Sequence, residues 1–517
     1  MYLKRWEDGV NRATLLPMLL VLLLGCRTPP TTPPTPPPTS PETVNLRIRA
    51  TPADATIDFG PLPSASGNLE LSDIAPGTYP LRVHRTGFRD HARLAPLDAS
   101  SKDIEVSLTP IPQPFHLDVT PDDTGWSLVR NGELLVEGIG DWSGDIETGN
   151  ITITASRDGY NEKKWSTYLD LPETARLWMD REGQIVEKLL EFKSGHHPKG
   201  LRFSPDSQEI WASFLGGPPS VAGYSATSGD ERHELTLGKN GAVEVIYSLD
   251  GEKVYASQME TASVYEIDRD SGDVLRTLGT QATWSKVMVL SHDGSRMYVS
   301  NWVSSDITEF DVETGAVLRE LDTVDTPRGL WLDGSGEWLY VLGFGNGKME
   351  RIWLESGKRE TIFEGGGTLR HIVGDAERGR LYISDMRKGT IWLHEPETGR
   401  TRSLARTDAN PNTIDLTPDG RLLFVSCRGQ NNRESYYKPG PQWGSVLVFD
   451  ALTGEKLDAI VAGNQPTALD VSDDGTLLGY SDMLDDRISV YRIPPREAFE
   501  GGGRTAVYKR ELWKGRR

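Results

Sequence analysis

Hydrophobic and polar residues alternate along most of the chain, which predicts β-strands rather than helices. The stretch SHDGSRMYVSN, residues 291–301, combines a tight turn at Asp293-Gly294 with such an alternating strand. This turn and strand recur, and the seven copies begin at Ser204, Ser248, Ser291, Asp333, Asp375, Thr417 and Ser472. An aromatic residue follows at one place in six copies, with Gly in the last: Trp211, Tyr255, Tyr298, Tyr340, Tyr382, Phe424 and Gly479. The usual spacing of about 42 residues is typical of one four-stranded propeller blade.

Each repeat is predicted to form four strands joined by hairpins. An inner strand precedes the Asp-Gly turn, the aromatic strand follows it, and a third strand leads through a turn such as Glu313-Thr314-Gly315 to an outer strand. The last repeat ends at Ile493 without an outer strand, whereas residues 186–192, VEKLLEF, precede the first inner strand without a partner. If residues 186–192 supply the missing strand, a ring of seven blades closes over residues 186–493.

These motifs resemble the YVTN-type β-propeller family, whose blades combine a Pro-Asp-Gly turn, a Tyr-Val-Ser/Asn strand and a Thr-Gly hairpin. The resemblance implies an all-β fold with a seven-bladed propeller, and some related propellers are lactonase-like. Two repeats depart from the pattern, because Ser207 replaces the turn glycine of the first and the glycine of the fifth is displaced to Gly379. We expect these two hairpins to differ locally from the others.

Two shorter segments before the repeats share a pattern of their own. The stretch IAPGTYPLRVHRTGF, which ends at Phe88, aligns with IETGNITITASRDGY, which ends at Tyr160. The alignment matches Gly77 with Gly149 and Phe88 with Tyr160. The pattern resembles the PEGA domain, a small β-sandwich-like module, over residues 44–110 and more loosely over 111–182, where Thr148-Gly149 replaces the usual Pro-Gly. The resemblance implies a spacer or interaction module rather than an enzyme.

The N-terminus predicts export. Residues 1–26 place Lys4 and Arg5 before an apolar run too short to span a bilayer, and LLGC ending at Cys26 resembles a bacterial lipobox. The resemblance implies lipidation of Cys26, a membrane anchor and a location in the cell envelope, facing the periplasm or the exterior. An ordinary signal peptide or a buried first helix is the alternative. Residues 27–43, rich in Pro and Thr, are expected to form an extended tether.

Composition narrows the choice of partners. A formal net charge of −19 disfavours nonspecific binding to nucleic acid, which requires clustered Lys and Arg. Two cysteines, Cys26 and Cys427, exclude a disulfide framework. The 53 Gly and 33 Pro residues favour a chain with many turns.

Basic residues recur five positions before the turn motif, where a propeller places the mouth of its channel. This column reads Lys199, Val243, Lys286, Arg328, Arg370, Asn412 and Thr467. Converging cations in a concave site attract carboxylates or phosphates. The alternatives are that each cation pairs with an acid such as Asp385 or Asp482, or stays solvated.

Residues just after the second strands are expected on the same face: Asn301, Trp302, Asp385, Arg387, Arg428 and Asp482. The sixth repeat is longer here, and its extra loop, residues 427–444, carries Tyr436, Tyr437 and Trp443. The loop is predicted either to cover the channel and grip a sugar or peptide by stacking, or to be decorative.

Motifs for catalysis or a cofactor are absent from the sequence. In the lactonase-like alternative, Arg328 and Arg370 would polarise a lactone and His371 would act as base. The pair His196-His197 has no spaced His or Cys partner in sequence, so no metal site is predicted. Residues 494–517 form a basic tail that either binds an anionic surface or a partner, remains solvated, or docks through Tyr508 and Trp513.

The sequence thus predicts an anchored envelope protein whose propeller binds a partner protein, an envelope polymer or an anionic small ligand. A lactonase-like hydrolase and a pure scaffold are the alternatives.

Overall fold

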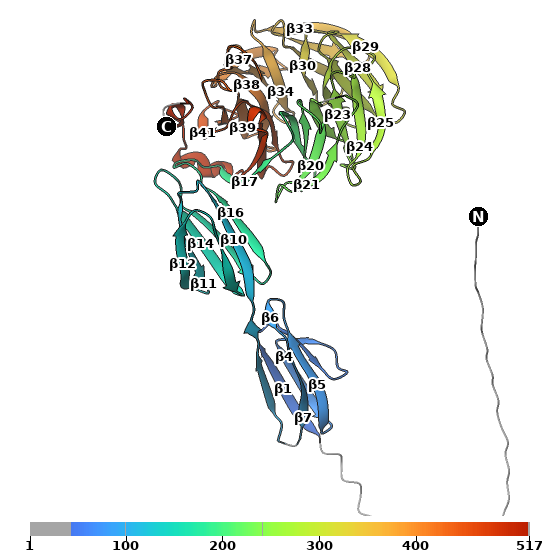
Figure 1. Ribbon diagram of the computed structural model, residues 1–517. Coiled ribbons are helices and arrows are strands. Elements are labelled where there is room, and N and C mark those ends of the chain that lie inside the picture. Colours follow the sequence, from blue (N-terminus) through green and yellow to red (C-terminus); the bar gives the residue numbers. More distant parts are fainter. Residues whose placement is uncertain (1–42, 99, 240, 515–517) are drawn as a thin grey trace, which may run out of the picture. The chain divides into compact units, whose positions relative to one another are not determined.

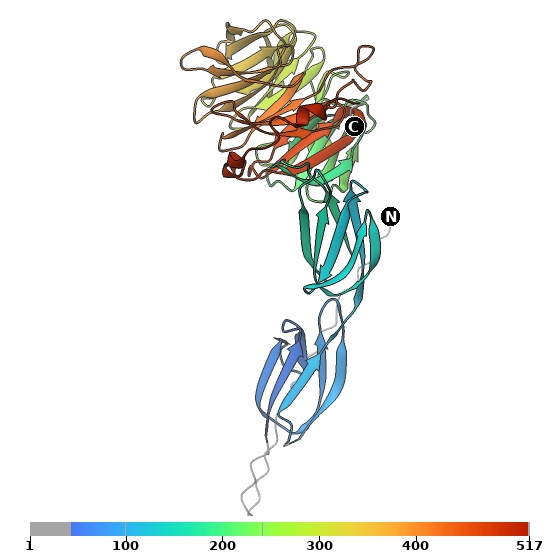
Figure 2. The same cartoon turned by 90° about the vertical axis from the view of Figure 1, so that its left-hand side faces the viewer.

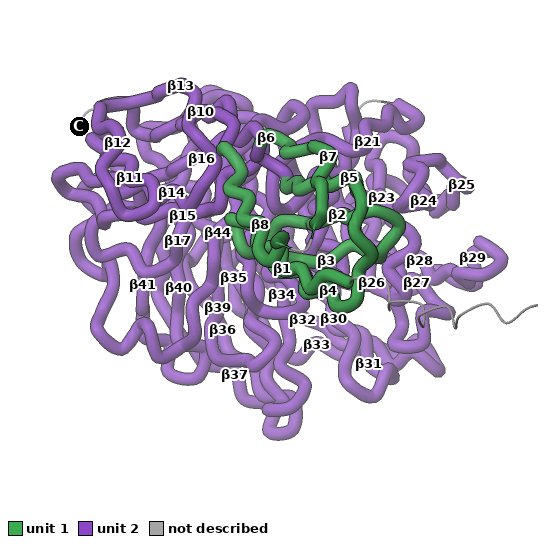
Figure 3. The backbone as a smooth tube through the Cα atoms, turned by 90° about the horizontal axis from the view of Figure 1, so that it is seen from below, with its two compact units in different colours: residues 1–85, 89–109 green, residues 86–88, 110–517 purple. Residues whose placement is uncertain are grey.

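The computed structural model describes residues 43–98, 100–239 and 241–514, and these residues are mostly β-strand (Figures 1 and 2). The described residues divide into two compact units, one within 43–85 and 89–109 and the other within 86–88 and 110–514 (Figure 3). The predicted signal peptide, Cys26 and all of the tether except its last residue lie outside the described residues. Among the residues described, no helix has the length and apolar character needed to cross a membrane.

The first unit contains two sheets. The sheet β4-β1-β8 pairs β1 antiparallel with β4 and parallel with β8, and the other has the order β3-β2-β5-β7. Alternate side chains of β1, such as Leu46 and Ile48, are buried with Ile57 and Phe59 of β2. The strands of this region are β1 (Val44–Thr51), β2 (Thr56–Phe59), β3 (Ala65–Ser66), β4 (Asn68–Ile74), β5 (Gly77–His84), β6 (Phe88–Arg89), β7 (His91–Leu97), β8 (Asp103–Ser107) and β9 (Thr109–Pro110).

Residues 112–178 repeat this strand scheme. The sheet β13-β10-β16 pairs β10 antiparallel with β13 and parallel with β16, and the second sheet has the order β12-β11-β14-β15. The strands are β10 (Pro112–Thr120), β11 (Gly125–Arg130), β12 (Glu133–Ile139), β13 (Trp142–Glu147), β14 (Gly149–Ser156), β15 (Lys163–Leu169) and β16 (Glu173–Trp178). The two modules therefore share one topology, in line with their aligned glycines.

Seven four-stranded antiparallel sheets follow within the described residues 187–492. Six are consecutive in the chain: β18 (Pro198–Phe203), β19 (Glu209–Phe214), β20 (Val221–Ser225), β21 (Glu231–Leu235); β22 (Glu244–Tyr247), β23 (Lys253–Gln258), β24 (Ser263–Asp268), β25 (Val274–Gly279); β26 (Ser285–Leu290), β27 (Arg296–Asn301), β28 (Asp306–Asp311), β29 (Val317–Asp322); β30 (Pro327–Leu332), β31 (Trp338–Gly343), β32 (Lys348–Trp353), β33 (Lys358–Glu364); β34 (Leu369–Asp375), β35 (Arg380–Asp385), β36 (Thr390–Glu395), β37 (Arg400–Arg406); β38 (Pro411–Leu416), β39 (Leu422–Cys427), β40 (Ser445–Asp450) and β41 (Lys456–Val461). The first strands of these sheets lie beside one another in chain order, and β18 also lies beside β42 of the seventh sheet.

The seventh sheet joins distant parts of the chain in the order β17-β44-β43-β42. Its strands are β17 (Glu187–Lys193), β42 (Pro466–Val471), β43 (Leu477–Asp482) and β44 (Arg487–Arg492), with the short 3-10 helix η1 (Met483–Asp485) between the last two. β17 pairs antiparallel with β44 from Glu187 opposite Arg492 to Lys193 opposite Arg487. The predicted pairing of residues 186–192 with the last repeat is therefore confirmed.

The two hairpins that depart from the repeat pattern behave differently. Ser207 adopts φ +59° and its amide donates to Ser204 O at 2.8 Å, as the amide of Gly251 donates to Ser248 O at 3.0 Å. The expected local difference in the first repeat is therefore wrong, because Ser207 accepts the left-handed conformation that favours glycine. In the fifth repeat the expectation is right, since the Gly379 amide donates to Ala376 O one residue later than in the other hairpins.

The C-terminal residues are docked rather than solvated. The 3-10 helix η2 (Arg496–Gly501) buries Phe499 against the sixth and seventh sheets, and η3 (Tyr508–Arg510) buries Tyr508 against the fifth and sixth. The Tyr508 hydroxyl donates to Asp408 Oδ2 at 3.0 Å, and Trp513 forms a β-bridge with Gln442. The interpretation of this segment as a solvated tail is wrong, because its apolar side chains outweigh its charge in deciding where it lies.

Replacement of Leu190 by Ala tests the importance of the β17–β44 pairing. Leu190 is 4% exposed and packs among the buried residues of the first and last sheets. We expect the free energy of unfolding to fall by about 2–4 kcal/mol, the usual cost of a buried Leu to Ala change. Urea denaturation followed by tryptophan fluorescence measures this. Leu275→Ala on β25, an exposed outer-strand position, is the matched control and should change the free energy by less than about 0.5 kcal/mol; equal effects would contradict the account.

Candidate functional site

A cavity of about 230 Å³ gathers most of the basic residues predicted for the channel mouth. We call it the basic cavity, and its lining is Lys199, Leu215, Val243, Met259, Lys286, Trp302, Arg328, Phe344, Arg370, Met386, Arg428 and Tyr436. It contains all four basic residues of the mouth column and a fifth cation, Arg428. The structure thus brings together residues that span more than 200 positions of the sequence.

Two positions of each repeat build this cavity. Lys199, Lys286, Arg328 and Arg370 are each the second residue of a first strand, at a point where the pairing register with the next strand shifts. Such a β-bulge bends the strand and re-aims a side chain. The other position is the residue after each second strand: Leu215, Met259, Trp302, Phe344, Met386 and Arg428. Because hairpin strands run antiparallel, these two positions meet at one edge of every sheet.

The guanidinium groups of the basic cavity are buried and incompletely paired. Arg328 and Arg370 are 4% exposed and Arg428 is 6% exposed. Arg370 Nε donates to Asn412 Oδ1, and Arg428 Nη2 donates to Gln465 Oε1. Among the described residues, Arg328 Nη1, Arg370 Nη1 and Arg428 Nε are buried without a hydrogen-bond partner. Buried donors without partners are rare and costly, so these three atoms point to a missing acceptor.

Aromatic rings hold the remaining cations. Lys286 Nζ lies 3.3 Å from the centroid of the Trp302 ring, a cation–π contact. Lys199 Nζ donates to the Tyr436 hydroxyl at 2.7 Å, and the Arg428 guanidinium lies 4.4 Å from the same ring. Tyr436 belongs to the long loop of the sixth repeat, and Gln465 Nε2 fixes this loop by donating to Tyr436 O at 2.8 Å. The loop therefore supplies one wall of the basic cavity.

The charges in the cavity perturb one another. Burial lowers the pKa of Lys286 to about 5, with Arg328 and Arg370 adding to the effect. Burial and the same two arginines, with Arg428, also hold the pKa of Lys199 well below its usual value. Within the part of the chain that the structure describes, the one ion pair of the five cations joins Arg328 Nη1 to Glu244 Oε2 at 3.8 Å. The cavity is therefore a buried basic site whose positive charge at neutral pH lies mainly on its arginines.

The two acids that could have neutralised these cations have other partners. Asp385 accepts from Thr368 N at 3.0 Å and from Trp392 Nε1 at 3.1 Å. Asp482 accepts from Gly463 N at 2.8 Å and pairs with Arg487. The alternative in which Asp385 or Asp482 pairs with the mouth cations is therefore wrong, and burial of the arginines also contradicts the solvated alternative.

Four predicted ligand-binding residues do not line the basic cavity. The Asn301 amide is buried and donates to Asp306 and Thr308, Arg387 is exposed, and Tyr437 is half exposed against the His197 ring. Trp443 lines a different crevice, shared by the second module, the seventh sheet and the C-terminal segment.

Two of these four misses, Asn301 and Arg387, have one cause, which is an error of one position in the sequence. Only the residue directly after the second strand faces the cavity, so Asn301 lies too early and Arg387 too late. The residues missed at this position are Leu215, Met259, Phe344 and Met386, and their shared place in the repeat was the available signal.

His371 lies in a separate cavity of about 280 Å³, lined also by Lys199, Arg202, Glu244 and Asp415. It follows Arg370 on β34, and neighbouring residues of the strand line different cavities. Burial and the nearby arginines lower the pKa of His371 to about 3. An imidazole with this pKa is a weak base. His371 also lines a different cavity from Arg328 and Arg370, so these three residues do not form one lactonase-like group.

Comparison with known proteins agrees with this architecture. Residues 43–111 match the PEGA domain, which confirms the expectation for residues 44–110. A chain of hydrazine synthase from Kuenenia stuttgartiensis superimposes with a TM-score of 0.51 at 18% identity, covering 58% of this chain and 97% of that one, and this likeness concerns the fold alone.

The fold and the matched domain define an all-β protein in which a PEGA domain precedes a set of four-stranded antiparallel sheets. Antigen Lp49 of Leptospira interrogans serogroup Icterohaemorrhagiae serovar copenhageni is 32% identical over 327 residues, which are 61% of this chain and 71% of the antigen. The chain therefore belongs to the family of antigen Lp49.

Replacement of Lys286 by Met tests the stability cost of holding the pKa of this lysine below its ordinary value. Because folding lowers the pKa of this lysine, the folded state loses stability as the pH falls below the unfolded-state value of about 10.4. Lys286→Met should therefore raise the free energy of unfolding by about 1–3 kcal/mol at pH 7, and by less at pH 9.5.

Urea denaturation at both pH values measures the effect of Lys286→Met. The exposed Lys358 on β33 gives the control variant Lys358→Met, which should change the free energy of unfolding by less than about 0.5 kcal/mol. A loss of stability in Lys286→Met at pH 7 would contradict the interpretation that burial in the cavity lowers the pKa of this lysine.

Proposed function

We propose that this protein is a lipid-anchored envelope protein whose seven sheets are the blades of a β-propeller, and that the basic cavity binds a small anion carrying an apolar group. The observation that carries the proposal is the convergence of five basic residues on one cavity, with three buried guanidinium nitrogens that have no hydrogen-bond partner among the described residues. A bound carboxylate or phosphate would accept from these donors and would offset the repulsion among the cations. Neither a scaffold nor a structural core requires such a group of charges.

The lining also limits the ligand. The six residues that follow the second strands are mainly apolar, so the cations are surrounded by Leu215, Met259, Trp302, Phe344 and Met386. A ligand that fills the cavity would place an anionic group at Arg328 and Arg370 and an apolar group against this collar. The volume of about 230 Å³ lies below the range typical of drug-sized ligands. A larger partner, such as an envelope polymer or a protein, would have to insert a single anionic end group.

The cellular location follows from separate observations. The lipobox-like sequence ending at Cys26 supports export and lipidation, and the name of antigen Lp49 supports exposure to an immune system. The PEGA domain and the second module lie between the tether and the sheets in sequence, where they would act as spacers. We place the protein at the cell envelope with its basic cavity available to solutes.

Ligand binding can be tested by isothermal titration of the full chain with phenyl phosphate, inorganic phosphate and phenol. Phenyl phosphate should bind more tightly than either of the others, because it alone supplies both an anion and an apolar group. Arg370→Met should weaken phenyl phosphate binding by about tenfold or more, the loss expected for a charge-assisted hydrogen bond.

Two further variants separate the parts of the binding proposal. Phe344→Ala should weaken binding of phenyl phosphate and leave inorganic phosphate unchanged, whereas the exposed Arg387→Ala should affect neither. Equal binding by wild type and Arg370→Met would overturn the proposal. Absence of binding by all three probes would favour the scaffold alternative.

Lipidation can be tested by metabolic labelling with radioactive palmitate in a bacterium that expresses the full chain. The wild type should carry the label, and Cys26→Ser should not, because the acyl groups are attached to this cysteine. The buried Cys427 provides the control, since a conservative Cys427→Ser variant should remain labelled. Label retained by Cys26→Ser would contradict the anchor.

A further inference from the structure

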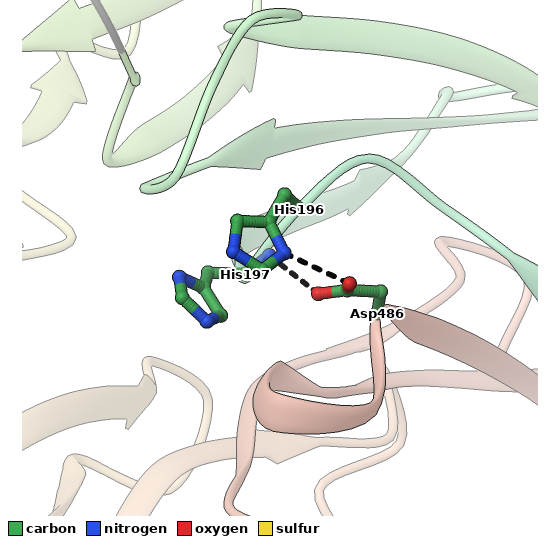
Figure 4. A group of neighbouring side chains, drawn as sticks. All are labelled: His196, His197 and Asp486. Carbon is green, nitrogen blue, oxygen red and sulfur yellow. Dashed lines mark hydrogen bonds and ion pairs between the residues drawn. The ribbon is translucent and has the colours of Figure 1, made fainter. Parts of the chain in front are cut away.

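Two consecutive histidines meet a distant aspartate beside the long loop of the sixth repeat (Figure 4). His196 and His197 lie between β17 and β18, and Asp486 lies between η1 and β44. His196 Nδ1 donates to Asp486 Oδ2 at 2.8 Å, and the His197 backbone amide donates to Asp486 Oδ1 at 2.8 Å. One ligand atom from each of the three residues lies within 4.8 Å of the others.

The backbone holds this group in place from three sides. The carbonyl groups of His196 and His197 accept from the amides of Gly216 and Leu215, at 3.1 Å and 2.9 Å. The carbonyl group of Asp486 accepts from Ser194 N at 2.9 Å. His197 and Asp486 both have positive φ, at +59° and +51°. Three segments of the chain therefore fix the backbone from which the three side chains extend.

Gly216 leaves room for the imidazoles. A Cβ atom at this position would lie 2.4 Å from His196 Cδ2 and 3.0 Å from His197 Nδ1, closer than atoms pack. The rings of His196 and His197 stack with centroids 3.7 Å apart.

We propose that His196, His197 and Asp486 form a binding site for a divalent transition-metal ion of the zinc class. Two imidazoles and one carboxylate are a ligand set that zinc accepts, with water completing the coordination. Binding of the ion would release the Nδ1 proton of His196 that now bonds to Asp486 Oδ2 at 2.8 Å, and these two ligand atoms would then separate to about 3.4 Å, the spacing of tetrahedral zinc ligands. The three ligand atoms lie within 4.8 Å of one another, whereas the ligands of a tetrahedral zinc ion are about 3.4 Å apart, so one ring must shift by up to about 1.4 Å. His196 is 55% exposed and has the room to do so.

The site would also touch the wall of the basic cavity. The His197 ring lies 5.2 Å from the Tyr437 ring, and Tyr437 contacts Tyr436, which lines the cavity. The metal ligands themselves do not line the basic cavity. Metal binding and anion binding are therefore separate properties, and loss of either one leaves the other proposal standing.

The test is a titration of the full chain, carrying no polyhistidine tag, with Zn²⁺ in competition with a chromophoric chelator. Wild type should bind one equivalent of Zn²⁺. His196→Ala and Asp486→Asn should each weaken the affinity by about tenfold or more, as for loss of one ligand. His292→Ala is the control, since its ring bonds to Asp333 O outside the cluster, and it should bind as wild type does.

Two more measurements keep the proposal testable if Asp486→Asn disturbs the fold. Gly216→Ala retains all three ligands but displaces the His196 ring, so it should also weaken Zn²⁺ binding. Co²⁺ in place of Zn²⁺ should give a visible absorption band in wild type that is lost in His196→Ala. Less than half an equivalent of bound Zn²⁺, or equal affinity in His196→Ala and His292→Ala, would overturn the proposal.

Discussion

The pairing of β17 with β44 is the constraint on which the seven sheets depend. It joins Glu187 to Arg492 and so returns the chain to the point where the sheets begin. Without β17 the seventh sheet would have three strands. The first strand of each sheet lies beside the first strand of the following sheet. A shift at the β17–β44 junction would therefore be expected to move the β-bulges that carry Lys199, Lys286, Arg328 and Arg370.

The basic cavity holds buried basic side chains in positions that lower the stability of the fold. Arg328, Arg370 and Arg428 each bury a nitrogen that has no hydrogen-bond partner among the described residues, and burial lowers the pKa of Lys286 to about 5. Each of these features costs free energy in the empty protein. Rigid bulges and the Tyr436 loop keep the charges in place, so the cavity is preorganised for an acceptor rather than collapsed around one. Stability given up at a site in this way is typical of binding and catalytic centres.

Much of the fold was predictable because each repeat carries its own turn signal and aromatic residue. The cations of the cavity were also predictable, since Lys199, Lys286, Arg328 and Arg370 share one place in the repeat. Residues after the second strands were mostly missed, because a strand end cannot be located to one residue from sequence. Asp486 could not be linked to His196, which lies 290 positions earlier, because only the closing sheet brings them together.

The central claim is that the cavity holds positive charge which an anion relieves. The most direct measurement is an NMR titration of the Lys286 side chain, with ¹⁵N-labelled lysine assigned through Lys286→Met. Without ligand, Lys286 should titrate near the pKa of about 5 given by its burial and its arginine neighbours. Saturation with phenyl phosphate should raise this pKa above about 7, because the bound anion favours the charged ammonium. A pKa near 10.4 in the empty protein, unmoved by the anion, would contradict the account.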